Sequence, residues 1–154
     1  MNYYLNIGSN LGNRLMNLSR AVSAIEKEFG WFELSHHIES EPWGFDSSNK
    51  FLNIGMLVIS DREPVDVLHA LQAIEKSISP KAHRNADGSY RDRLIDIDIM
   101  AAFPDDPSEN AVDEYGNPVE EYGIVMHTPE LTLPHPHLRD RAFFLDAFRE
   151  LRAL

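Results

Sequence analysis

The sequence has no cysteine, few basic residues and no long apolar run. Without cysteine it can form no disulfide and no thiolate metal site, and it has no cysteine nucleophile. It holds 14 Lys and Arg against 25 Asp and Glu, a formal net charge of −11. This balance argues against a general nucleic-acid binder, because a phosphate backbone is held by an excess of lysine and arginine. No apolar run approaches the roughly 20 residues that span a bilayer, so we expect a cytoplasmic protein that binds no membrane.

The apolar pattern alternates between strand and helix periods along 154 residues, a length typical of one compact domain. We expect a single domain over 1–154. Its β-α-β-β-α-β order, followed by a further helix, predicts a ferredoxin-like α+β sandwich, in which an antiparallel sheet carries helices on one face and leaves the other for a ligand. The expected strands are 3–7, 31–38, 51–59 and a stretch from 94, and the expected helices are 15–29, 64–78 and about 138–151.

The stretch from Arg91 to Met100 is the most informative about chemistry. Three isoleucines alternate with Asp96 and Asp98, so both carboxylates share one face of a strand. Same-face positions lie roughly 6.5 to 7 Å apart, a spacing that suits hard cations such as Mg²⁺. Arg91 and Arg93 precede the strand, and guanidinium forks suit phosphate oxygens. Taken alone, the pattern also fits an ordinary strand whose polar side meets water.

Charge is distributed unevenly in the second half of the chain. Basic residues gather in a polar loop over 81–93, whereas residues 102–121 contain seven acids and no lysine or arginine. A small basic site in an acidic protein would concentrate a small anion locally. Residues 104–121 are also rich in Pro, Gly and Asn, so we expect an acidic surface insertion with a hairpin around Gly116-Asn117.

Two pairs of side chains allow either a structural or a ligand-binding role. Phe51 and Asn53 lie two residues apart on a strand and would form an aromatic surface with an amide beside it. The structural alternative is a strand end with one solvated polar residue. Gln72 and Glu75 lie three residues apart and would project together from a helix, although a solvated helix face explains them equally well.

The C-terminal third holds a similar ambiguity. His135 lies between two prolines that would fix its position. Arg139 and Arg141 fall in the expected first turn of the last helix, where positive charge opposes the helix dipole. An anionic ligand at that end would explain both arginines better than stability does.

Motifs along nearly the whole chain resemble those of the 6-hydroxymethyl-7,8-dihydropterin pyrophosphokinase family of the folate pathway. The Arg-x-x-Asp-x-Asp-Ile piece and the Leu-Thr-x-Pro-His-Pro piece are specific, and both occur in order within a ferredoxin-like pattern. The matching pieces are 8–12 (GSNLG), 41–44 (EPWG), 51–53 (FLN), 74–75 (IE), 93–99 (RLIDIDI), 131–136 (LTLPHP) and 141–143 (RAF).

The resemblance implies an enzyme that transfers the terminal diphosphate of ATP to the hydroxymethyl group of 6-hydroxymethyl-7,8-dihydropterin and releases AMP. It implies two Mg²⁺ ions held by Asp96 and Asp98, with Arg84 and Arg93 completing the catalytic set. We expect a monomer. The implied ATP-binding residues are Gln72, Glu75, Arg84, Arg93, Ile99, Thr132, His135 and Arg141, and the implied pterin-binding residues are Ser40, Pro42, Trp43, Phe51, Asn53, Asp96 and Phe143.

The chain departs from the family pattern in the loop after the second helix. That loop usually begins with Gly-Arg and carries a further arginine, whereas here it begins with Ser79-Pro80-Lys81. We assign its phosphate-binding arginine to Arg84 rather than to Lys81 or Arg91. Two other functions are compatible with these residues: another Mg²⁺-dependent nucleotidyl or phosphoryl transferase, and a non-catalytic ferredoxin-like module that binds a small regulator.

Overall fold

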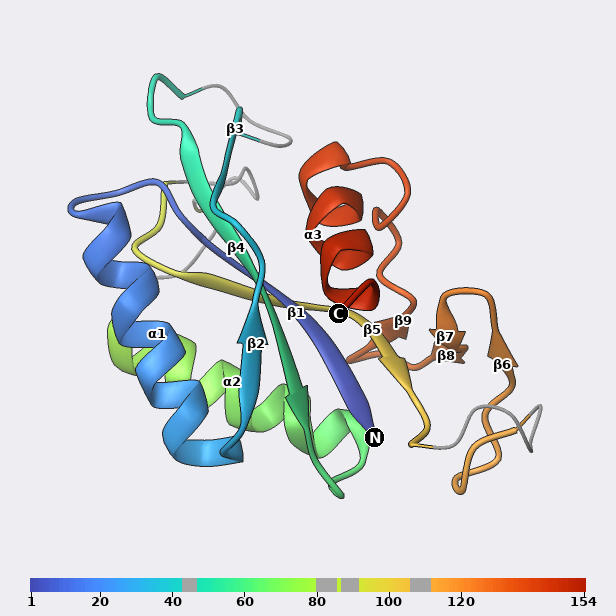
Figure 1. Ribbon diagram of the computed structural model, residues 1–154. Helices are drawn as coiled ribbons and strands as arrows, with labels where there is room; N and C mark the ends of the chain where they lie inside the picture. Colours follow the sequence, from blue (N-terminus) through green and yellow to red (C-terminus); the bar gives the residue numbers. More distant parts are fainter. Residues whose placement is uncertain (43–46, 80–85, 87–91, 106–111) are drawn as a thin grey trace.

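The protein is built on one antiparallel sheet with helices on both sides (Figure 1). A computed structural model describes residues 1–42, 47–79, 86, 92–105 and 112–154. The main strands lie in the order β2-β4-β1-β5, and β3 pairs with β4 beyond the end of β2. This order and the two intervening helices confirm the predicted ferredoxin-like α+β fold. The strands of this sheet are β1 (Asn2–Ser9), β2 (Phe32–Leu34), β3 (Ile38–Ser40), β4 (Phe51–Ile59) and β5 (Asp96–Phe103).

One face of the sheet is covered by α1 (Arg14–Phe29) and α2 (Pro64–Ile78). Helix α1 begins where the Asn13 side chain accepts a hydrogen bond from Met16 N, and α2 begins with proline, which has no N–H to leave unpaired. Both helices pack against the strand residues that point to their side. The buried residues of this core include Tyr3, Leu5, Ile7, Leu18, Ile25, Met56, Val58, Val67, Leu71, Ile97 and Ile99.

The opposite face is divided between an apolar half and a polar half. Helix α3 (Ala142–Arg152) packs its Phe144 and Phe148 against Tyr4 and Met100 in a second buried cluster. Because side chains alternate along a strand, residues such as Asn6 of β1 point to this same face. The C-terminal helix therefore covers one half of the face that we expected to be free, and polar side chains occupy the other half.

Two predicted element boundaries are wrong. The single strand expected over 31–38 is divided, because Ser35 interrupts it: Ser35 Oγ accepts a hydrogen bond from Gly55 N at 2.7 Å. The last helix begins at Ala142 instead of about Leu138, since the preceding residues form turns that bond back to His135 and His137. Arg139 therefore lies outside the helix, and Arg141 is its N-cap residue.

Of the acidic insertion, the structure describes residues 104–105 and 112–121. A turn around Gly116 is closed by a bridge between Val112 and Pro118, near the position predicted for a hairpin. At Gly123 (φ +96°) the chain passes so close to β5 that a Cβ atom would collide with the carbonyl oxygen of Ala102. Short strands complete this region: β6 (Val119–Glu120), β7 (Gly123–Ile124), β8 (Met126–His127) and β9 (Thr132–Leu133). In the described part of the chain, no helix combines the length and apolar character required to cross a membrane.

Candidate active site

Asp96 and Asp98 lie on the polar half of the sheet, as the alternation predicts. The alternating residues Ile97 (7% exposed) and Ile99 (3% exposed) point to the other face, into the core beneath α1 and α2. The two aspartates are a quarter exposed, at 25% and 26% for their side chains, so a ligand can reach them. Strand register places Asp96 beside Gly8 and Asp98 beside Asn6 on the neighbouring strand β1. The acids thus border a polar strip that crosses the sheet.

The two carboxylates repel each other strongly. Burial and the nearby charge of Asp96 raise the pKa of Asp98 to about 8, although Arg141 and Arg93 act in the opposite direction. Arg93 Nη1 lies 3.0 Å from Asp96 Oδ2, and the Arg93 side chain is almost fully buried. The site therefore contains the Arg93 guanidinium beside two carboxyl groups. This excess of acidic groups favours the binding of a further cation.

Glu75 reaches the same acids from α2, around the edge of the sheet. Its Oε1 accepts a hydrogen bond from Ile97 N at 3.2 Å, which satisfies an outward backbone group of β5. Burial and the proximity of Asp96 raise the pKa of Glu75 to about 9. Through its hydrogen bond from Ile97 N, Glu75 holds the start of β5 against α2.

The donor set fits magnesium. Asp96 and Asp98 offer two hard carboxylate oxygen donors. Within the described residues, no group of three or more His, Cys, Asp or Glu side chains could hold a metal by protein ligands alone. Mg²⁺ is commonly bound through one or two carboxylates, with waters and substrate phosphates as its other ligands. A pair of partly exposed, mutually repelling aspartates matches that mode better than it matches a closed protein cage.

His135 faces the acid pair from the turn after β9. Its backbone N donates to Met100 O on β5, and its Nε2 lies 3.8 Å from Asp98 Oδ1. The His135 Nδ1 accepts a hydrogen bond from His137 N at 3.0 Å, so the ring proton is on Nε2. Burial and nearby Arg141 lower the pKa of His135 to about 4, which leaves a neutral ring with an N–H donor directed toward the site.

The start of α3 brings Arg141 and Phe143 toward this turn. The buried Phe144 ring packs edge-on against two other rings. Its centre lies 5.0 Å from the centre of the His135 ring and 5.0 Å from the centre of the Phe143 ring. The Arg141 guanidinium lies 4.9 Å from the centre of the Phe144 ring. Phe144 therefore fixes three predicted site residues relative to one another through packing.

Three of the residues predicted to bind a pterin, Ser40, Phe51 and Asn53, lie together at the start of β4. Asn53 Nδ2 donates to Ser40 Oγ at 2.8 Å and to Ile38 O at 3.0 Å, so β3 holds its amide. Phe51 pairs with Ser40 in the same register, and the Arg93 guanidinium lies 5.8 Å from the Phe51 ring centre. At the adjacent Gly8 a Cβ atom would be 2.9 Å from Asn53 Oδ1, so any larger residue would press against the Asn53 amide.

For four other predicted residues in the described parts of the chain, the structure gives mainly their exposure. Gln72 is exposed one turn before Glu75, and Thr132 and Pro42 are half-buried. Ile99 packs in the core, so any contact with a nucleotide must come from its backbone. Trp43 and Arg84, together with the alternatives Lys81 and Arg91, lie outside the described residues.

The structure adds residues that our reading of the sequence missed. Asn6 is 3% exposed; its Nδ2 donates to Asn53 Oδ1 at 3.4 Å, and its Oδ1 has no hydrogen-bond partner in the described part of the structure. Strand alternation from Tyr4 would have placed Asn6 on the ligand face. Asn10 and Asp92 were also missed; they form a network that joins two segments of the site. No local pattern marks that pair, since 82 residues separate them.

Similarity to known proteins extends over nearly the whole chain. A family model described as 7,8-dihydro-6-hydroxymethylpterin-pyrophosphokinase matches residues 4–153. A 2-amino-4-hydroxy-6-hydroxymethyldihydropteridine pyrophosphokinase of Porphyromonas gingivalis is 36% identical over 143 residues, which is 91% of this chain and 83% of the relative. The protein of the same name from Aquifex aeolicus is 28% identical over 148 residues, or 96% and 78% of the two chains. The chain therefore belongs to the 7,8-dihydro-6-hydroxymethylpterin-pyrophosphokinase family, whose members are diphosphotransferases that use ATP.

Proposed function

We propose that this protein transfers diphosphate from MgATP to 6-hydroxymethyl-7,8-dihydropterin and releases AMP, a step of tetrahydrofolate biosynthesis. The observation that carries the proposal is the continuous polar strip on one sheet face. Asp96 and Asp98 stand at one side of it, and Phe51 and Asn53 stand at the other, with Gly8 between them. The two acids that would hold Mg²⁺ and the groups that would contact a flat, amide-rich ring are therefore neighbours on one sheet face.

In the proposed reaction, the hydroxymethyl oxygen attacks the β-phosphorus of ATP. A new oxygen–phosphorus bond forms, the bond from the β-phosphorus to the oxygen that bridges it to the α-phosphorus breaks, and AMP leaves with that oxygen. The hydroxyl proton passes to solvent. Phosphoryl transfers of this kind depend mainly on positioning and on charge stabilisation, so no strong general base is needed.

The side chains divide these tasks. Asp96 and Asp98 would hold two Mg²⁺ ions, which when bound would neutralise phosphate charge and polarise the transferring group. Arg93 and Arg141 would contribute fixed positive charge near the phosphates, and His135 would donate its Nε2–H as a neutral group. Asn53 would hydrogen-bond the edge of the pterin, and Phe51 and Phe143 would stack on its faces.

The remaining expectations follow from the same proposal. Gln72, Glu75, Thr132 and the backbone of Ile99 would line the nucleotide pocket, and Ser40, Pro42 and Trp43 the pterin pocket. Arg84 is the proposed additional phosphate-binding residue. Because every proposed group belongs to one chain, we expect a monomer to be active, and we place the reaction in the cytoplasm, where MgATP is available.

The test is AMP formation from MgATP with and without 6-hydroxymethyl-7,8-dihydropterin. We expect AMP only when the pterin and Mg²⁺ are both present, and a loss of at least about 100-fold in Asp96→Ala and in Asp98→Ala. Asp146→Ala, at an exposed position of α3, is the matched control and should retain wild-type activity. Folded wild-type protein that forms no pterin-dependent AMP would refute the proposal. Formation of ADP in place of AMP would indicate transfer of a single phosphoryl group.

A further inference from the structure

Asp92 accepts hydrogen bonds from three side chains that belong to two other segments. Its Oδ1 accepts from Asn10 Nδ2 at 2.8 Å and from Ser47 Oγ at 2.7 Å. Its Oδ2 accepts from Asn49 Nδ2 at 2.8 Å. Hydrogen bonds to an ionised carboxylate are about twice as strong as those between neutral groups. We call Asp92, Asn10, Ser47 and Asn49 the Asp92 clamp.

Backbone contacts strengthen the clamp. Asn10 Oδ1 accepts from Arg93 N at 2.7 Å, and Asn10 N donates to Arg93 O at 3.1 Å. Asn10 Nδ2 also donates to Asn49 O at 3.2 Å. The end of β1, the residues before β4 and the residues before β5 are thus joined at one place.

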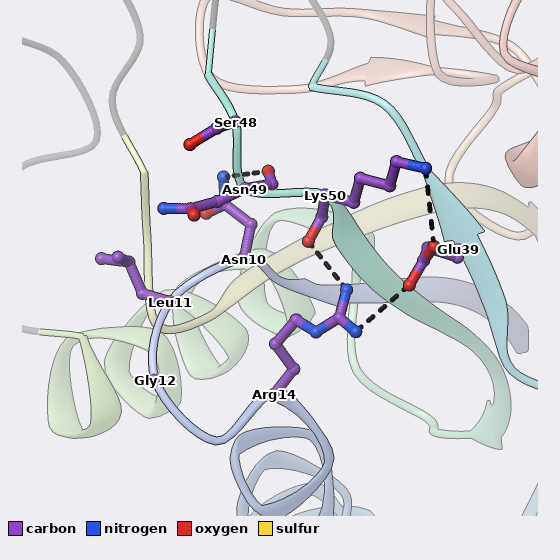
Figure 2. Close-up of a pocket in the computed structure, with 8 residues that line it drawn as sticks. All are labelled: Asn10, Leu11, Gly12, Arg14, Glu39, Ser48, Asn49 and Lys50. Atoms are coloured by element: carbon purple, nitrogen blue, oxygen red, sulfur yellow. Dashed lines mark hydrogen bonds and ion pairs between the residues drawn. The ribbon is translucent and has the colours of Figure 1, made fainter.

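Asn10 and Asn49 line a polar cavity of about 370 Å³. Figure 2 draws both side chains with the other residues that line it. On its other side, Arg14 of α1 donates to Lys50 O at 2.9 Å and to Glu39 Oε2 at 3.1 Å. The segment just before β4 is therefore anchored twice, once to a helix and once to Asp92. None of the predicted site residues that the structure describes lines this cavity.

The clamp connects the two halves of the proposed site. Asp92 immediately precedes Arg93, which is paired with Asp96 on the phosphate side. Asn49 lies two residues before Phe51, the first residue of β4 on the pterin side. A shift of Arg93 toward a bound phosphate would therefore be transmitted through Asp92 and Asn10 to the segment that leads into Phe51.

We propose that Asp92 is a positioning residue that couples nucleotide binding to pterin binding. This inference rests on the proposed function. A purely structural role of Asp92 would also explain the hydrogen bonds. That role predicts only that removing Asp92 lowers the stability of the fold. Coupling requires in addition that loss of Asp92 change the effect of one ligand on the affinity for the other.

The experiment measures the Kd of 6-hydroxymethyl-7,8-dihydropterin with and without a non-hydrolysable ATP analogue and Mg²⁺. In the wild type we expect the analogue to tighten pterin binding by at least about fivefold. Asp92→Asn keeps the side-chain volume but offers one acceptor oxygen, so we expect its coupling ratio to fall close to one. Asp146→Asn removes the same charge at an exposed position of α3 and should keep the wild-type ratio.

Ser47→Ala removes one donor to Asp92 from the opposite segment and provides a milder second variant. It should lower the coupling ratio partly, and the double variant should resemble Asp92→Asn, because both changes act on the same connection between Asp92 and the segment before β4. The inference is overturned if Asp92→Asn lowers Tm but leaves the ratio unchanged, or if the wild-type ratio is one. Wild-type protein that binds no pterin at all would instead refute the proposed function.

Discussion

The Arg93 guanidinium and the Asp96 carboxylate form an ion pair within the site, with Nη1 and Oδ2 3.0 Å apart and the arginine side chain only 9% exposed. Removing Arg93 would be costly, because the Asp96 carboxylate, which is only a quarter exposed and lies close to Asp98, would lose its neighbouring positive charge. Arg93 is thus paired with a carboxylate that we propose as a metal ligand. In the proposed reaction, the same guanidinium would also contact phosphate oxygens.

We predict that Arg93→Ala lowers the free energy of unfolding by about 3 kcal/mol, a typical effect of breaking a buried ion pair. Arg93→Lys should be destabilised less but should still raise the KM for ATP, because an ammonium group lacks the guanidinium fork. Urea denaturation and steady-state kinetics measure the two effects. If Arg93→Lys keeps the wild-type KM for ATP, Arg93 does not bind phosphate through its fork.

Gly8→Ala tests the pterin side of the site. The added Cβ would be 2.9 Å from Asn53 Oδ1 and 3.3 Å from Phe51 Cδ1, so both side chains must move. We predict that the KM for the pterin rises about tenfold, a displacement cost of roughly 1.4 kcal/mol, while the KM for ATP changes little.

The control for this change is Gly116→Ala, at a positive-φ turn where nothing lies within 4 Å of the new Cβ. It should cost about 1 kcal/mol of stability through backbone strain and leave both KM values unchanged. Equal effects of Gly8→Ala on both substrates would show that Gly8 does not act through Asn53 and Phe51.

The side-chain alternation of β5 could be predicted from the sequence because it is a local property. Asp96 and Asp98 share a face opposite Ile97 and Ile99, as their period of two requires. The shift in register near Met100 could not be predicted, since a β-bulge depends on pairing with β1 rather than on hydropathy. The interruption at Ser35 is similar, because its hydroxyl replaces a backbone partner of Gly55.

Long-range contacts account for the rest of what the sequence could not predict. Asp92 and Asn10 contact each other across 82 residues, and neither belongs to a motif whose spacing indicates the contact. The packing of Phe144 against His135 likewise depends on where α3 docks. The chemistry of the site could thus be predicted from residue types and resemblance, whereas the contacts that hold it follow from the packing of distant segments.

Asp113 tests whether the acidic insertion stabilises the fold or acts in the reaction. It is 8% exposed and accepts hydrogen bonds from Tyr115 N at 2.9 Å, from Asn117 N at 2.8 Å and from Asn117 Nδ2 at 3.0 Å. We predict that Asp113→Ala lowers the free energy of unfolding by about 2 kcal/mol. The turn contains none of the predicted site residues, so kcat should stay within about twofold of the wild type. A large fall in kcat at a temperature where the variant is folded would indicate that the insertion takes part in the reaction.

Tyr3 provides a pH-dependent test of the core. Its hydroxyl donates to Arg62 O at 2.6 Å, and its side chain is buried within the core beneath α1 and α2. Burial, assisted by the charges of nearby groups including Asp113, raises the pKa of Tyr3 well above its ordinary value of 10.0. The unfolded chain therefore releases this proton near pH 10, while the folded protein retains it.

The stabilising contribution of this raised pKa is full below about pH 10 and is lost as the pH rises further. We predict that Tyr3→Phe is less stable than the wild type by about 1 kcal/mol at pH 8, because it lacks the hydrogen bond to Arg62. Above pH 10 the wild type should lose stability faster than the variant, so the difference should narrow and then change sign. Urea denaturation of both proteins between pH 8 and pH 11 measures this, and a difference that stays constant over that range would contradict a raised pKa of Tyr3.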